Sequence, residues 1–186
     1  MDQRWVELAR TLRSLGLWQH LPEDGAAAAE RKVVEDEYPL GSFGDEPGGT
    51  WFFVDGESMA EGGVGRVLGK MAPSLGTYGV DLQVRTVSMP VGAEEGDYVV
   101  EINGRRCVVW TPADWAAKRA WETATVRPLA VVNDLLAEAG ATPRLFTLRA
   151  GSDDATAWLL DPRVVAAIAG SGLLEDREVP ALAAHG

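Results

Sequence analysis

The clearest pattern at the start of the chain is a helical stripe of apolar residues. They recur every three or four positions, at Trp5, Leu8, Leu12 and Leu15, while most charged residues of the segment fall elsewhere. Side chains with this spacing share one face of an α-helix. We therefore expect an amphipathic helix over residues 4–15. Residues 25–37 are a second helix candidate, because they contain strong helix formers, but their apolar stripe is thin, which leaves a surface helix or a mobile connector as the two interpretations.

Patterns typical of strands begin after residues 39–49, which are rich in Gly and Pro and are expected to form a loop. TWFFV at 50–54 is a run of aromatic and β-branched residues that suits a strand covered on both faces. VDLQVRTV at 80–87 alternates apolar and polar residues and predicts a half-buried strand. RLFTLR at 144–149 and ATAWLL at 155–160 predict two more strands, joined by a turn.

A β-hairpin is predicted over residues 97–110. Asn103-Gly104 stands between two apolar runs, and this pair favours the two positive φ angles of a type I′ turn. In that register Glu101 faces Arg106 as a cross-strand ion pair, and Val100 faces Cys107.

A capping signal marks the first helix of the main body. Ser58 and Glu61 match the S-x-x-E capping box, which predicts a helix running to about Leu75. Its interior glycines weaken it.

Two later helices begin with a capping residue followed by proline. Thr111-Pro112 predicts a helix that breaks near Pro128 and resumes to Gly140. Asp161-Pro162 predicts a last helix that Gly170 ends, followed by a frayed tail.

Together these elements predict an α+β fold. We expect a mostly antiparallel sheet of about five or six strands with helices packed on one face, because short connections favour antiparallel pairing. The predicted organisation is an N-terminal helical arm at 1–38, the loop at 39–49, a main body at 50–172 and a C-terminal tail at 173–186.

The charge of the chain narrows its possible partners. The 186 residues include 28 Asp and Glu against 17 Lys and Arg, a formal net charge of -11. This balance argues against binding to nucleic acids or to anionic membranes, since both require clustered positive charge. No long apolar run predicts a membrane span, and the N-terminus lacks the pattern of a signal peptide. With a single cysteine, the expected location is the cytoplasm.

The segments that most resemble cofactor- or metal-binding motifs do not have the residue spacing that those motifs require. Gly63, Gly65 and Gly69 lie in EGGVGRVLGKM, which departs from both the P-loop and the dinucleotide-binding fingerprint. His20 and His185 have no carboxylate or cysteine partner at a metal-ligand spacing. Cys107 is expected to be a buried strand residue without a histidine base. We therefore predict no cofactor and no metal site.

The candidate residues for acid–base catalysis lie in one predicted loop. Asp153 and Asp154, with Arg149, fall in a loop between two predicted strands, where paired acids could meet a substrate or a cation. Aspartates that stabilise a turn are the simpler interpretation. Asn133 and Asp134 interrupt an apolar helix, and a solvated helix edge is favoured over a buried polar pair.

Acidic residues gather in three predicted loops or element ends. The clusters are Glu35, Asp36 and Glu37, then Asp45 and Glu46, then Glu94, Glu95 and Asp97. One interpretation is a solvated surface that aids solubility. The other is a negative patch that attracts a basic protein partner.

The second interpretation gives the leading hypothesis, a non-catalytic bacterial interaction module. In general character the chain resembles small acidic α+β immunity proteins of bacteria, which neutralise a cognate toxin. No motif matches a named family, so no residue role is carried over from this resemblance.

An alternative is an enzyme or a small-molecule-binding protein. The seven tryptophans could line a cavity between the sheet and the helices, with Asp153, Asp154 or Arg149 at its mouth. A third hypothesis is one chain of a homo-oligomer, which would expose an apolar patch on helix 4–15.

Overall fold

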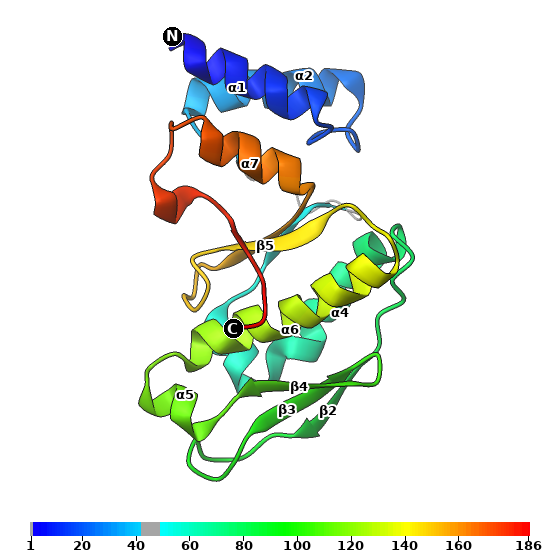
Figure 1. Cartoon of the computed structure of the whole chain (residues 1–186), viewed down its shortest axis with the longest axis vertical. Helices are drawn as coiled ribbons and strands as arrows, with labels where there is room; N and C mark the ends of the chain where they lie inside the picture. The colour runs from blue at the N-terminus through cyan, green and yellow to red at the C-terminus, as the bar shows by residue number, and fades with distance from the viewer. Residues whose placement is uncertain (1, 42–48) are drawn as a thin grey trace.

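The computed structural model describes residues 2–41 and 49–186. Its elements stack in layers along the long axis of the molecule (Figure 1). At one end lie α1 (Gln3–Ser14) and α2 (Glu23–Asp36), followed by α7 (Pro162–Gly170). A four-stranded sheet comes next, then α4 (Val64–Gly76) and α6 (Ala120–Glu138), and a three-stranded sheet closes the other end. The predicted α+β class is confirmed.

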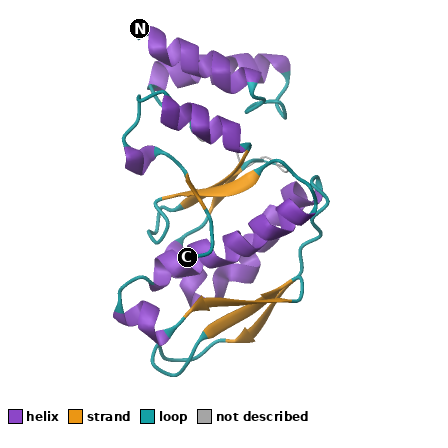
Figure 2. Cartoon of the chain, viewed as in Figure 1, coloured by secondary structure: helices purple, strands orange, loops and turns teal. Residues whose placement is uncertain are grey.

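The strands form two separate antiparallel sheets rather than one, and helices lie between them (Figure 2). The larger sheet has the order β1-β6-β5-β7, with β1 (Trp51–Phe53), β5 (Arg144–Leu148), β6 (Thr156–Leu160) and β7 (Ala181–Leu182). Its two faces belong to different cores: Leu145 and Leu159 pack with α4 and α6, whereas Phe146 and Trp158 pack with α1, α2 and α7. Helices therefore cover both faces, as continuous apolar strands such as RLFTL and TAWLL require.

The smaller sheet has the order β2-β3-β4, formed by β2 (Val84–Ser88), β3 (Tyr98–Ile102) and β4 (Arg105–Trp110). The predicted hairpin and its register are confirmed: Asn103 and Gly104 have φ of 48° and 78°, and Glu101 stands opposite Arg106. The ion pair of Glu101 is nevertheless made with Arg85 of β2, at 3.0 Å. A central strand has neighbours on both sides, and the hairpin pattern revealed only one of them.

The helix predicted from Ser58 begins differently. Asp55 is the capping residue, and its carboxylate accepts a hydrogen bond from the Ser58 backbone N–H at 2.6 Å. The chain then passes through α3 (Gly56–Ser58) and the π-helical turn η1 (Met59–Gly63) before α4. Gly62 has φ of 97°, which breaks the helix and makes the predicted Ser58–Glu61 capping box wrong.

The break predicted at Pro128 lies elsewhere. Pro128 is inside α6, and the helix that starts at Pro112 is the short α5 (Pro112–Ala116). Lys118, with φ of 56°, stands in the left-handed conformation that ends a helix. The chain therefore turns between α5 and α6 at this residue.

Asn133 ties α6 to the larger sheet. It is 7% exposed, and its side-chain amide donates to the carbonyls of Leu145 and Ala183 at 2.9 and 2.8 Å. Its side-chain oxygen accepts from the Leu145 N–H at 2.7 Å. The solvated helix edge favoured from the sequence is therefore wrong for Asn133. Nor is the end of the chain frayed, because β7 pairs with β5 and Ala183 is buried.

Asp114 holds the corner between α5 and α6. It is 3% exposed and forms a capping box with Thr111. Its two oxygens accept from the Arg127 guanidinium at 2.7 and 3.1 Å. Burial alone would raise the pKa of Asp114, but the hydrogen bonds from Arg127 and Thr111 outweigh it and hold that pKa below its ordinary value.

Replacing Asn133 by alanine should destabilise the protein by about 2–4 kcal/mol, because it leaves the buried Leu145 N–H and the Ala183 carbonyl without partners, while the Leu145 carbonyl keeps only its hydrogen bond from the Ala183 N–H. Chemical denaturation measures the change. The matched control is Asp134→Ala on the same helix, where a half-exposed carboxylate pairs with His185 and should contribute less than about 1 kcal/mol. Equal effects of the two substitutions would contradict the role of Asn133.

Asp114→Asn should cost about 1–2 kcal/mol at pH 6, since it removes a charge-assisted pair and weakens a cap. The folded pKa of Asp114 is depressed, so its contribution is present above the ordinary aspartate pKa of about 3.9 and is lost as pH falls through the folded value. The difference between wild type and variant should therefore shrink below about pH 4. Unfolding free energies measured across pH check this, and a constant difference would refute it.

Candidate functional site

The acidic clusters found in the sequence do not form one patch. Glu35 and Asp36 end α2, with Glu37 directly after it, in the layer at one end of the molecule. Glu94, Glu95 and Asp97 lie in the connection between β2 and β3, at the opposite end (Figure 1). Asp45 and Glu46 lie outside the described residues. The structure therefore separates the first and third clusters by the length of the molecule.

Of the two acidic clusters in the described residues, the one at 94–97 follows a run of exposed apolar side chains. Val87, Met89 and Val91 are 46%, 43% and 100% exposed, and Glu94 and Glu95 follow within a few residues and are also exposed. We call Val87, Met89, Val91, Glu94, Glu95 and Asp97 the 87–97 surface. Three of the five large apolar residues that are most exposed in the described chain belong to it.

The 87–97 surface continues an edge strand. β2 pairs with β3 on one side, and no other described strand pairs with its second side. The register shifts between Thr86 and Ser88, so Val87 is the extra residue of a bulge. All of β2 after Val84 is exposed. An apolar and uncovered strand edge is unusual in a natural protein unless something binds it.

The kink in η1 adds to this surface. A Cβ at Gly62 would lie 2.8 Å from the Met89 sulfur, so the Met89 side chain rests directly against the kink. Glu57 and Glu61 are exposed on the same turn and line a shallow hollow of about 370 Å³. From the sequence, Glu61 is expected in the first turn of a regular helix capped by Ser58, and Glu57 precedes that helix, so no pattern places these two acids beside residues 87–97.

A sequence signal for Val87 did exist. The alternation in residues 80–87 places Arg85 on the polar face of the strand, and Val87 falls on that same face two residues later. The alternation therefore predicts that Val87 is an apolar residue exposed on a polar face. Met89 and Val91 follow the strand and have no such periodic signal.

Of the acids proposed for catalysis, Asp154 is engaged in the turn between β5 and β6. Its carboxylate accepts from the Ser152 hydroxyl at 2.6 Å and from Arg149, whose φ is 55°. These hydrogen bonds, led by that of Ser152, hold the pKa of Asp154 below its ordinary value. Asp153 is exposed on the same turn. The geometry of Asp154 is that of a turn-stabilising carboxylate.

The tryptophans divide between the two cores. Two of them, Trp51 and Trp158, meet edge to face with ring centroids 6.4 Å apart. With Tyr38, Arg149 and Asp154 they line an open hollow of about 720 Å³ beside the larger sheet. The structure therefore brings together two of the tryptophans and two of the charged residues that the alternative hypothesis placed at a cavity.

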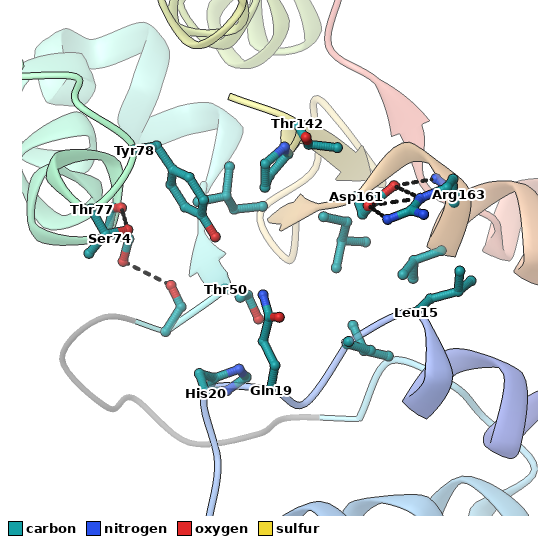
Figure 3. Close-up of a pocket in the computed structure, with 17 residues that line it drawn as sticks. Leu15, Gln19, His20, Thr50, Ser74, Thr77, Tyr78, Thr142, Asp161 and Arg163 are labelled. Carbon is teal, nitrogen blue, oxygen red and sulfur yellow. Dashed lines mark hydrogen bonds and ion pairs between the residues drawn. The ribbon is translucent and has the colours of Figure 1, made fainter. Parts of the chain in front are cut away.

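A second cavity lies where five segments of the chain meet, at residues 15–20, 49–50, 74–78, 142–143 and 159–164. It has a volume of about 540 Å³, and its walls include the connection between α1 and α2, the end of α4, the corner between β6 and α7, and the segments just before β1 and β5 (Figure 3). Gln19, His20, Thr50 and Tyr78 line it. No sequence motif pointed to this cavity, because its walls come from positions far apart in the chain.

Cys107 and His185 have surroundings that differ from those of a reactive thiol or a metal ligand. Burial raises the pKa of Cys107 to about 11, so its thiol stays protonated at neutral pH. His185 contacts Asp134 at 2.8 Å, a partner that local spacing did not reveal. Residues 2–41 and 49–186 hold no group of three His, Cys, Asp or Glu side chains that could bind a metal ion. None of their helices combines the length and apolarity needed to cross a membrane.

Comparison with known proteins leaves the chain without an assigned family. No family model matches it, and no curated protein and no solved structure is significantly similar to it.

Proposed function

We propose that this protein is a non-catalytic interaction module that binds a basic protein partner through the 87–97 surface. The observation that carries the proposal is the coincidence of exposed Val87, Met89 and Val91 with the acidic residues Glu94 and Glu95 at an uncovered strand edge. Neither feature alone would distinguish an interface from an ordinary solvated surface.

The two kinds of side chain have complementary roles in such an interface. Carboxylates attract a basic partner over several ångströms and speed its association. Apolar side chains lose contact with water in the complex and slow its dissociation. The free edge of β2 could also pair with an extended segment of the partner.

The kind of partner follows from the charge of the surface. A protein with a cationic face, such as a toxin that acts on nucleic acid, would match both Glu94 and Glu95 and the nearby Glu57 and Glu61. In this role the protein would be an acidic immunity protein or inhibitor, acting in the bacterial cytoplasm.

A second candidate function is the binding of a small molecule. The hollow lined by Trp51, Trp158, Arg149 and Asp154 favours it, since aromatic walls with a few charged groups at the mouth are typical of ligand sites. Its volume of about 720 Å³ falls within the usual range for such sites.

Reversing the charge of the 94–97 cluster tests the leading proposal. A basic partner captured from the source organism should associate about ten- to a hundredfold more slowly with the triple variant Glu94→Lys, Glu95→Lys, Asp97→Lys at low salt. Stopped-flow or surface plasmon resonance measures the rate. The matched control is the triple variant Glu35→Lys, Asp36→Lys, Glu37→Lys, which changes the net charge by the same amount at the other end of the molecule.

The control should leave association nearly unchanged, and both variants should keep the melting temperature of the wild type. Val91→Ser should speed dissociation roughly tenfold, because a fully exposed valine has no role in folding and loses only interface burial. Equal slowing by both triple variants, or association insensitive to salt, would sink the proposal.

A further inference from the structure

The cavity between α1, α4 and the corner of β6 and α7 is lined by polar and apolar side chains that could contact a ligand. Its volume of about 540 Å³ is in the range of pockets that hold small molecules. None of the residues of the 87–97 surface lines it. A ligand here would contact the N-terminal helices and the main body together.

Several polar groups converge in this cavity. In Figure 3 the Tyr78 hydroxyl and the Gln19 side-chain amide extend toward the space beside Thr50. Within residues 2–41 and 49–186, none of these three side chains is hydrogen-bonded to another residue. They can both donate and accept, so they are available to a ligand that does the same.

Two further hydroxyls have fixed orientations. Ser74, which is 4% exposed, donates its hydroxyl hydrogen to the carbonyl of Gly49 at 2.9 Å. Thr77 donates to the carbonyl of Ser74 at 2.7 Å. Because their hydrogens are engaged, the oxygens of Ser74 and Thr77 can act toward a ligand only as acceptors.

The opposite charges of Asp161 and Arg163 in the cavity wall are paired with each other. The Arg163 guanidinium donates to both carboxylate oxygens of Asp161, with distances of 2.6 and 3.1 Å. Asp161 also caps α7 by accepting from the Arg163 N–H at 2.8 Å. This pair therefore offers no uncompensated charge to attract an ionic ligand.

The rest of the wall is mostly apolar, apart from His20 and Thr142. Leu17 and Leu159 are 7% and 3% exposed, and the ring of Tyr78 stands beside the cavity in Figure 3. A ring and aliphatic side chains favour a ligand with a flat apolar face, while the hydroxyls and the amide favour one with a rim of hydroxyl groups.

We propose that this cavity binds a small, neutral, cyclic polyol, such as a monosaccharide or a cyclitol. Such a molecule presents donors and acceptors around its edge and C–H groups on its faces, which matches the arrangement of Gln19, Thr50 and Tyr78 over the leucine wall. The inference is independent of the proposed partner surface.

An NMR titration of the full chain tests it. Glucose, galactose, mannose and myo-inositol are added at millimolar concentration to the 15N-labelled protein, with glucose 6-phosphate as the charged comparison. At least one neutral polyol should shift the amide signals of Gln19, Thr50 and Tyr78 in a saturable way. Tyr78→Phe should weaken its binding about three- to tenfold, because one hydrogen bond is lost while the ring remains.

Tyr38→Phe is the matched control, since Tyr38 lines the other hollow and its loss should leave the affinity unchanged. Melting temperatures identify any variant that fails to fold, and Thr50→Val then supplies a second test of the same cavity. No saturable shift with any neutral polyol would overturn the proposal. So would tighter binding of glucose 6-phosphate than of glucose, or an affinity untouched by both cavity substitutions.

Discussion

The arrangement of the whole molecule depends on how α6 is attached to the strands on either side of it. On one side, Asn133 uses its entire side-chain amide to bind the backbone of Leu145 and Ala183. On the other, apolar residues such as Leu129 and Leu136 share a core with β3 and β4. An amide buried with all of its partners satisfied permits one register only, because a shift along the helix would leave several polar groups unpaired.

This attachment explains which faces of the molecule remain uncovered. Helices cover both faces of the larger sheet, so a ligand could reach it only at its edges. The hollow beside Trp51 and the cavity beside Tyr78 lie there. The smaller sheet uses one face against α4 and α6. Its edge strand β2 and the connection to β3 are left exposed, and the apolar and acidic residues of the proposed interface lie there.

Features determined by neighbouring residues could be predicted from the sequence. The Asn103-Gly104 turn fixed the hairpin register, and Asp161-Pro162 marked the start of α7, because each depends on local backbone chemistry. The partners of Asn133 could not be predicted, since they lie 12 and 50 residues away. The same holds for Met89 against Gly62 and for the convergence of Gln19, Thr50 and Tyr78, which only the tertiary packing brings about. Two separate sheets also escaped prediction, because the alternation of a strand indicates burial without identifying the strand beside it.

The claim that α6 joins both sheets into one cooperative unit is tested most directly by native-state hydrogen exchange. The Leu145 amide, which donates to Asn133 at 2.7 Å, should exchange with the same free energy of opening as the amides of the central strand β3 in the other sheet. Both should respond to denaturant with the slope of global unfolding. If the Leu145 amide opened at a much lower free energy than β3, the two sheets would be separate units and this account of α6 would be wrong.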